Sequence, residues 1–327
     1  MLNRRRFIGL AASSLAAPSI LSSGARAADW PARPVRVVVP FTPGGSTDIT
    51  ARLVSNRLQE VWGQSVVVEN RPGAGGNIAA DVVAHSDPDG YTIFIVGPGL
   101  ATNQFLYPQL SYDPVGDFAP VTLLITQPNL MCVPNSSPAK SAQEFIAYCN
   151  ANPGKVTYAS SGNGTTLHLS GELFKRLAKV EMIHIPYRGG APAINDLIPG
   201  RVDVIFDNMP SILPHAKAGS LRALAVTTKE RVAVVPDIPT IAESGVPGFD
   251  VFSWFGFFVP AKTPEGVIAK INADTNAALV YPAVKTRFEE LGATPKGSTP
   301  AELATFLKSE IDKWGPVIRE AKIRVEN

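Results

Sequence analysis

The sequence predicts an α/β fold in which two lobes face each other across a central cleft. From Ala28 onward, short apolar runs rich in β-branched residues alternate with stretches of helical periodicity. That alternation is typical of a mainly parallel sheet covered by helices. A strand, a glycine-rich turn and a helix follow one another twice, first around Gly45 and again around Gly162. Two copies of this unit indicate two lobes.

The first unit begins with a buried strand at residues 35–39 and turns at Pro43-Gly44-Gly45. Backbone N–H groups at the start of the next helix are unpaired and lie at the positive end of its dipole, which favours an anion. A simple strand-to-helix turn also favours glycine, so the pattern alone leaves both interpretations open. The candidate ligand-binding residues here are Phe41, Thr42, Gly44, Gly45, Ser46 and Asp48.

The second unit has a strand at residues 156–160 and a turn at residues 161–166, and apolar residues then recur at helical spacing. Two further candidates, Tyr187 and Asp207, follow predicted strands at residues 182–186 and 202–206. We expect Asp207 to face the same cleft. The candidate ligand-binding residues at the second turn are Ser160, Ser161, Gly162, Gly164, Thr165 and His168.

The remaining elements divide the chain between the lobes. Further strands are predicted at residues 66–69, 91–96, 121–133, 221–227 and 251–259, with helices between them and a helical C-terminal part. The 121–133 run is broken by Gln127-Pro128-Asn129 and is long enough to pass from one lobe to the other. The apolar run at 251–259 provides the return. The predicted first lobe is therefore residues 28–128 plus 251–327, and the second lobe is residues 129–250.

Residues 1–27 have the pattern of an export signal that is removed. Arg4-Arg5-Arg6 is a twin-arginine signature, and Ala25-Arg26-Ala27 fits the small-x-small cleavage rule; a general secretory signal is the alternative. The chain has 30 basic and 28 acidic residues, and removing the signal's four arginines leaves 26 basic against 28 acidic. This balance provides no basic stripe for nucleic acid. We expect a periplasmic protein without a membrane span.

Enzyme and metal motifs are missing from the sequence. The glycine-rich segments fail the dinucleotide fingerprint, and no Walker A or G-x-S-x-G motif occurs. The histidines lack metal-ligand spacing, so no cofactor or metal is expected. Cys132 and Cys149 form one disulfide or none. The alternative function is an exported serine hydrolase for a small ester or amide, acting through Ser46 or Ser160 with His168.

Several longer motifs resemble the Bug family, the extracytoplasmic receptors of tripartite tricarboxylate transporters. They occur at residues 41–48 (FTPGGSTD), 69–77 (ENRPGAGGN), 158–168 (YASSGNGTTLH), 185–193 (IPYRGGAPA), 236–245 (PDIPTIAESG) and 254–256 (WFG). The resemblance implies a type II, Venus-flytrap periplasmic binding protein without enzymatic activity. It also implies that the turns at 42–48 and 160–165 grip a ligand carboxylate together.

The resemblance implies a membrane permease, or instead a sensor protein, as partner, and we expect a monomer. We expect a small mono- or dicarboxylate as ligand, with Phe41 forming a wall of the pocket. Arg188 is the cationic candidate for a second carboxylate. The carboxylate of Asp48 would repel a ligand carboxylate beside it. We therefore expect Asp48 to hold the first turn or to accept a hydrogen bond from a ligand ammonium or hydroxyl.

Overall fold

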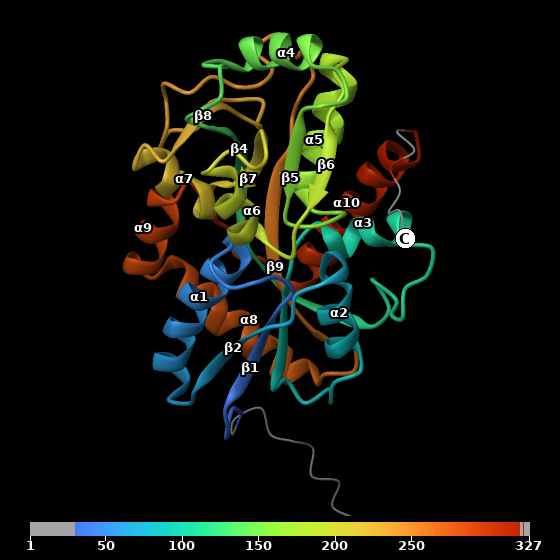
Figure 1. The fold of residues 1–327 in the computed structure, drawn as a ribbon. Helices are drawn as coiled ribbons and strands as arrows, with labels where there is room; N and C mark the ends of the chain where they lie inside the picture. Colours follow the sequence, from blue (N-terminus) through green and yellow to red (C-terminus); the bar gives the residue numbers. More distant parts are fainter. Residues whose placement is uncertain (1–29, 321–322, 324–327) are drawn as a thin grey trace, which may run out of the picture.

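The computed structural model describes residues 30–320 and residue 323, so the predicted export signal lies outside the described residues. Two lobes lie one above the other, and a curled 10-stranded sheet runs through both (Figure 1). The strands are β1 (Val35–Val39), β2 (Val66–Asn70), β3 (Thr92–Val96), β4 (Phe118–Pro134), β5 (Thr157–Ser160), β6 (Ile183–Pro186), β7 (Val204–Asn208), β8 (Leu221–Val226), β9 (Phe252–Pro260) and β10 (Thr294–Pro295). The helices are α1 (Ser46–Trp62), η2 (Ala74–Gly76), α2 (Asn77–Ala84), α3 (Gly99–Leu106), α4 (Ala142–Ala151), α5 (Thr166–Ala178), α6 (Gly190–Leu197), α7 (Met209–Lys217), α8 (Glu265–Val280), α9 (Pro282–Glu290) and α10 (Pro300–Glu320).

The sheet is parallel near its two ends and antiparallel in its middle, whereas the sequence predicted a mainly parallel sheet. Strand β1 pairs parallel with β2 and β3, and β5 pairs parallel with β6 and β7. Strand β9 runs antiparallel to β3 and β4, and β4 runs antiparallel to β7, β8 and β10. The alternation of strands and helices describes the two ends correctly. The same alternation does not predict the antiparallel middle of the sheet, because the long strands β4 and β9 pair directly with each other.

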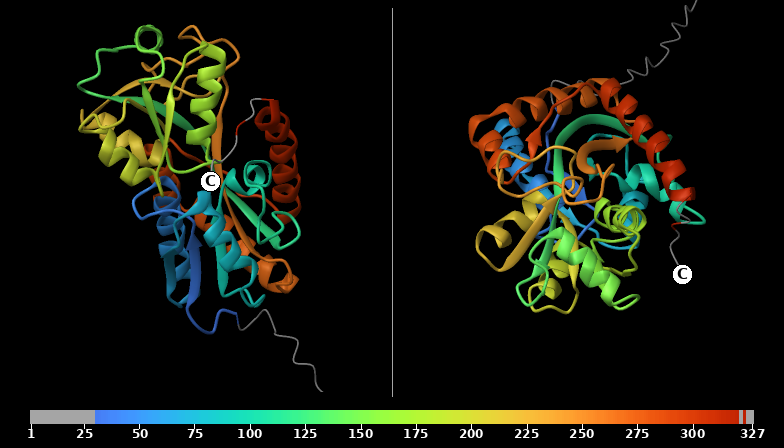
Figure 2. Two further views of the ribbon diagram at one scale, coloured as in Figure 1. Left: turned by 45° about the vertical axis from the view of Figure 1, so that its right-hand side comes forward. Right: turned by 90° about the horizontal axis from the view of Figure 1, so that it is seen from above.

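Strand β4 changes partners at Pro128. Residues 118–128 pair with β9, and residues from Asn129 onward pair with β7 and β8. The predicted interruption at residues 127–129 is therefore a change of pairing within one continuous strand. Figure 2 shows the central strands passing between the lobes in the middle of the molecule. The lobe boundaries of residues 28–128 plus 251–327 and residues 129–250 stay a prediction.

Helix α10 packs against both halves of the molecule, along whose side it runs (Figure 2). Leu303 belongs to an apolar cluster with Phe94 of β3. Trp314, eleven residues further along, belongs to a cluster with Phe145 of α4. The C-terminal helix thus contributes to two of the apolar clusters of the protein.

Two buried tryptophans share the carboxylate of Glu310 on α10. Trp254 Nε1 of β9 donates to Glu310 Oε2 at 2.9 Å, and Trp314 Nε1 donates to the same oxygen at 3.3 Å. Glu310 is 4% exposed. Buried N–H groups are costly to leave unpaired, so this carboxylate ties α10 to the central strand β9.

We expect Glu310→Ala to lower the free energy of unfolding by about 2–4 kcal/mol, because it leaves two buried indole N–H groups without an acceptor. Urea denaturation followed by tryptophan fluorescence measures this change. Asp312→Ala is the matched control, since Asp312 is exposed on the same helix. Equal stabilities of the two variants would contradict the assigned role.

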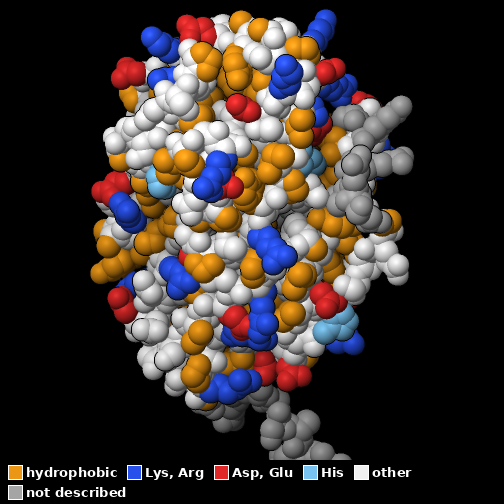
Figure 3. Space-filling model, viewed as in Figure 1, with side chains coloured by type: hydrophobic (Ala, Val, Ile, Leu, Met, Phe, Trp, Pro, Cys, Tyr) orange, Lys and Arg blue, Asp and Glu red, His pale blue; other side chains and the backbone are white. Residues whose placement is uncertain are grey.

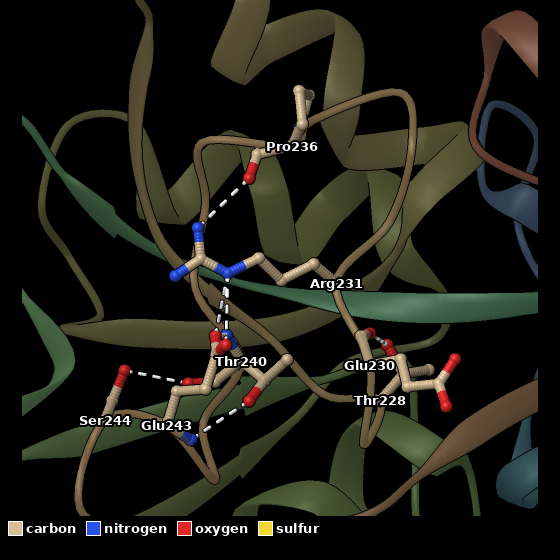
Figure 4. A network of polar contacts seen from close by, with 7 residues as sticks. All are labelled: Thr228, Glu230, Arg231, Pro236, Thr240, Glu243 and Ser244. Carbon is tan, nitrogen blue, oxygen red and sulfur yellow. Dashed lines mark hydrogen bonds and ion pairs between the residues drawn. The ribbon is translucent and has the colours of Figure 1, made fainter.

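A polar network fixes the long connection between β8 and β9 (Figure 4). Arg231 Nε donates to Glu243 Oε2 at 2.9 Å, and Arg231 Nη1 donates to the carbonyl of Pro236 at 3.2 Å. Thr240 N donates to Glu243 Oε2 at 2.8 Å, and Glu243 N donates to Thr240 Oγ1 at 3.0 Å. This reciprocal pair has the form of a capping box. It stabilises the turn of the 236–245 motif as a compact loop.

Both cysteines are buried free thiols in the structure. Cys132 and Cys149 lie in different apolar clusters. Burial raises the pKa of both thiols, to about 12 for Cys149. The disulfide left open by the sequence is therefore not formed here. Among the described helices, none is both long and apolar enough to cross a membrane.

Candidate functional site

A cavity lies between the lobes, and about 40 Å³ of it can hold the centre of a water-sized sphere. The space left between the lobes is therefore narrow. The residues that line it are Pro40, Phe41, Gly45, Ser46, Thr47, Gly75, Gly76, Ala80, Phe94, Val96, Gly97, Pro98, Gly99, Leu100, Asn103, Tyr112, Ser161, Thr165, Thr166, Gly190, Asp207, Asn208, Ser253 and Phe255.

The starts of six described helices converge on this cavity. The N-cap residues of α1, α2, α3, α5 and α7 line it, and so does the first residue of α6; they are Gly45, Gly76, Pro98, Thr165, Asn208 and Gly190. In Figure 1, α1 and α2 lie below the middle of the molecule and α5, α6 and α7 lie above it. Each start carries unpaired N–H groups and a partial positive charge. The cavity is therefore electropositive through backbone dipoles.

The lining combines polar and apolar residues. Polar groups come from the helix starts and also from Asn103 of α3, from Tyr112 and from Ser253 of β9, and the apolar residues include Phe41, Phe94, Val96, Leu100 and Phe255. The lining residues include no lysine, arginine or histidine. Arg188, the predicted cation for a second carboxylate, is not part of this lining. The arrangement suits one anionic group attached to an apolar body.

At the first predicted turn, Phe41, Gly45 and Ser46 line the cavity, whereas Thr42, Gly44 and Asp48 do not. Thr42 N donates to the carbonyl of Arg188 at 3.1 Å, and Gly44 N donates to Asp48 Oδ2 at 3.0 Å. The hydroxyl of Ser46 donates to Gln127 Oε1 at 2.9 Å. Asp48 thus holds the turn together, one of the two roles expected for it.

The charge of Asp48 is balanced inside the first lobe. Arg52 Nε donates to Asp48 Oδ2 at 3.0 Å, and Asn70 Nδ2 donates to Asp48 Oδ1 at 3.0 Å. Burial on its own would raise the pKa of Asp48, but the hydrogen bonds from Arg52, Gly44 and Asn70 lower it overall. The carboxylate is therefore ionised and paired away from the cavity.

At the second predicted turn, Ser161 and Thr165 line the cavity, whereas Ser160, Gly162, Gly164 and His168 do not. Thr165 is the N-cap of α5 and its Oγ1 donates to the carbonyl of Gly162 at 2.7 Å. The turn is therefore folded around its own polar groups, with two of its hydroxyl-bearing residues facing the ligand space.

Behind the second turn lie two stacked histidines. The rings of His168 and His184 lie 4.3 Å apart, and Ser160 Oγ lies 2.6 Å from His184 Nε2. Burial lowers the pKa of His168 to about 4 and that of His184 to about 3. Both rings are therefore neutral at physiological pH. Ser160 is fully buried, and neither it nor the two histidines are part of the cavity lining.

The two remaining candidates lie apart. Tyr187 does not line the cavity; its hydroxyl donates to Asp196 Oδ2 at 2.8 Å. Asp207 does line the cavity and is 2% exposed. Burial raises the pKa of Asp207 to about 7, against the opposing hydrogen bonds from Asn208 and Ser211. Asp207 is the single carboxyl group in the lining.

The lobes touch each other around the cavity, which is the closed arrangement of a two-lobed fold. Thr102 Oγ1 donates across the cleft to the carbonyl of Gly164 at 2.9 Å. A Cβ atom at Gly45 would lie 3.4 Å from Gly190 N. A Cβ atom at Gly164 would overlap Asn103 Oδ1, and the positive φ of 80° also favours glycine there. Glycines allow this close approach of the two lobes.

Several lining residues were not among the sequence candidates. They are Thr47, Gly75, Gly76, Gly97, Pro98, Gly99, Leu100, Thr166, Gly190, Asn208, Ser253 and Phe255, among others. Most follow a strand and begin a helix, as the predicted turns do. The same strand–turn–helix signal could have identified them at residues 70–77, 96–99, 186–190 and 206–209. Phe255 and Ser253 carry no such signal, since they lie in an aromatic strand that reads as core.

Comparisons with known proteins agree on one family. The family model described as "Tripartite tricarboxylate transporter family receptor" matches residues 50–323. A Pseudomonas sp. protein from the tcbD–tcbE intergenic region is 41% identical over 98% of this chain and 96% of its own length. Protein BugT of Bordetella pertussis is 38% identical over 98% of this chain and 97% of its own length.

Solved structures resemble this one in fold. R. palustris Rpa4515, solved with adipate, has a TM-score of 0.89 at 42% identity and covers 91% of this chain and 100% of its own. MatC from Rhodopseudomonas palustris, solved with bound malate, has a TM-score of 0.83 at 38% identity, covering 88% of this chain and 100% of its own. The periplasmic binding protein BugD has a TM-score of 0.88 at 34% identity, covering 90% and 100%. The predicted two-lobed α/β binding-protein fold is confirmed.

Proposed function

Because the chain belongs to the tripartite tricarboxylate transporter receptor family, we propose that it captures a small mono- or dicarboxylate between its lobes for uptake by such a transporter. The resemblance to the Bug family is confirmed by BugT and BugD. The observation that carries the proposal is the convergence of six helix starts on one cavity without a cationic side chain in its lining.

Backbone dipoles supply the attraction for a carboxylate here. Each helix N-terminus stabilises a nearby anion by about 0.3–2 kcal/mol, more when the site is partly buried. The closed lobes exclude water, which lowers the local dielectric constant and strengthens the contact. Gly45, Ser46 and Thr47 from one lobe and Thr165 and Thr166 from the other supply these groups. Their position on both sides of the cavity supports a carboxylate held between the two predicted turns.

The apolar residues of the lining support a ligand with a hydrocarbon body. Phe41, proposed as a wall, lines the cavity, and so do Phe94 and Phe255. Adipate and malate, found in two related structures, are both dicarboxylates and so fall within the proposed class of ligand. The lining lacks the cations that a tricarboxylate such as citrate needs, which supports a mono- or dicarboxylate.

The proposed setting is the periplasm, reached through a twin-arginine signal at residues 1–27 that is cleaved near Ala27. The proposed partner is the membrane permease of the transporter, or a sensor protein, with the receptor acting as a monomer. Figure 3 shows charges of both signs scattered over one face of the molecule, with no single-sign patch that would suggest nucleic acid.

We propose that the protein is not an enzyme. The hydrolase alternative requires a serine beside a base in contact with substrate. Ser160 has a histidine partner but is fully buried, and Ser46 lines the cavity but its hydroxyl donates to an amide oxygen of Gln127. Neither serine combines both properties, and no observation favours the hydrolase.

A thermal-shift screen tests the proposal with butyrate, succinate, adipate, malate, citrate and benzoate, with glucose and putrescine as controls. A ligand at a hundredfold its Kd adds about 2.7 kcal/mol to the stability of the mature protein, so a true ligand raises Tm clearly. We expect at least one mono- or dicarboxylate to do so and citrate to do less. Stabilisation by glucose or putrescine alone would contradict the proposal.

A further inference from the structure

The buried carboxyl of Asp207 lies where the bound anion is proposed to sit. A Cβ atom placed on Gly190 would lie 3.0 Å from Asp207 Oδ2, and one on Gly45 would lie 3.4 Å from Gly190 N. The carboxyl is thus next to the start of α6, which in turn lies beside Gly45 of the first predicted turn, and Asp207 lines the same cavity as Gly45. An ionised Asp207 would repel a ligand carboxylate held there.

The hydrogen bonds around Asp207 provide a place for a proton. Ser211 Oγ lies 3.0 Å from Asp207 Oδ2 and 2.9 Å from the carbonyl oxygen of Asn208. Ser211 Oγ is the donor to both oxygens, and since a hydroxyl has one proton, it compensates a negative charge on Oδ2 only in part. The second carboxyl oxygen, Oδ1, accepts from Asn208 N at 2.7 Å.

No charged side chain among the described residues pairs with Asp207. Strand β4, its antiparallel neighbour, contributes the thiol of Cys132, whose pKa is raised by burial and by Asp207 itself. Helix α7 contributes Ser211, and α6 contributes Gly190. On α1, Asp48 and Arg52 pair with each other. On α5 and β6, the neutral His168 and His184 stack together.

We propose that Asp207 makes ligand capture proton-coupled: it binds a proton from solvent on Oδ2 as the ligand carboxylate enters, and the neutral acid is the form present in the complex. This inference rests on the proposed carboxylate function. In the ligand-free protein burial raises the pKa of Asp207 to about 7, so the group is poised to change protonation near physiological pH. A ligand anion beside it raises that pKa further.

Calorimetric titration of the mature protein with adipate and succinate, between about pH 6 and about pH 9, tests the inference. These acids are fully ionised over the upper part of that range, so their own protons do not contribute there. We expect Kd to rise toward tenfold per pH unit above the pKa of free Asp207. Titrations near pH 8 in two buffers of different ionisation enthalpy should show uptake approaching one proton per ligand.

Asp207→Asn should remove both the proton uptake and the pH dependence of Kd, because its amide keeps a donor at every pH. Asp312→Asn, on the exposed face of α10, should keep the wild-type pH dependence. Infrared difference spectra of the wild-type protein provide a second readout, and we expect the carboxylic-acid C=O band to grow on ligand addition near pH 8.

Binding without proton uptake and without growth of that band would overturn the inference and leave the proposed function intact. The absence of binding by any acid in the screen, at every pH, would overturn the proposed function itself and the inference with it.

Discussion

Gly45→Val should weaken carboxylate binding about 100-fold, equivalent to about 2.7 kcal/mol, because its γ-carbons would occupy the space between the starts of α1 and α6. A Cβ atom at Gly45 already lies 3.4 Å from Gly190 N. The backbone of Gly45 is extended, with φ −80° and ψ 168°, so a valine fits its conformation. The loss should therefore come from the site rather than from unfolding. Titration calorimetry with the best acid of the screen measures it.

Gly45→Ala is the matched control for that variant. Both substitutions replace a glycine N-cap of α1 by a residue that caps poorly, which costs about 1 kcal/mol of stability in each case. The alanine Cβ makes an ordinary van der Waals contact with Gly190 and leaves the cavity open. We expect its affinity to stay within about threefold of the parent. Equal affinities of the two variants would contradict the proposed closure of the lobes around the ligand.

Acidification should destabilise the protein through the buried pair His168 and His184. Their folded pKa values of about 4 and about 3 lie below the ordinary 6.5, so the unfolded chain takes up protons first as the pH falls. The stability they contribute is complete above pH 6.5 and is lost as the pH approaches the folded values. Each histidine contributes at most about 1.4 kcal/mol per pH unit in that window. Asp207 acts in the opposite direction, since its raised pKa adds stability at low pH.

A double variant separates these contributions. The double variant carries both His168→Gln and His184→Gln. Between about pH 6.5 and about pH 4 its free energy of unfolding should fall less steeply than that of the parent, and the two slopes should differ by about 1 kcal/mol per pH unit or more. Urea denaturation at several pH values measures both curves. The exposed His85→Gln should leave the slope unchanged. Parallel curves for the parent and the double variant would show that the stacked pair is not the acid-sensitive element.

The fold was largely predictable because its strands and helix starts carry local signals. The run from Val35 to Val39 is apolar and β-branched, and it is a buried strand beside two parallel partners. The antiparallel centre was not predictable in the same way. Pro128 could break a strand or mark a change of pairing partner. Which of the two occurs depends on the strands that pair with β4 before and after it, and this tertiary arrangement has no local sequence signal.

Part of the cavity lining was predictable, namely residues of the two turns and Phe41, and part was not. Gly45 and Thr165 begin helices, and helix starts can be read from glycine and hydroxyl residues after a strand. Phe255 lies in the aromatic strand β9, in which neighbouring rings belong to the core. No local pattern distinguishes Phe255, which reaches the cavity, from the other aromatic residues of that strand. Likewise, the sequence does not reveal that His168 packs on His184 behind the turn, because that contact joins two separate elements.

The most direct test of the central claim is a crystal structure of the mature protein grown with the acid that stabilises it best. We predict a ligand carboxylate in the interlobe cavity, with its oxygens accepting hydrogen bonds from backbone N–H groups in the first turns of α1 and α5 and with its hydrocarbon part against Phe41 and Phe94. Ligand density elsewhere, such as the groove between Gln127 and Arg231, or a carboxylate held by side-chain cations alone, would contradict the account.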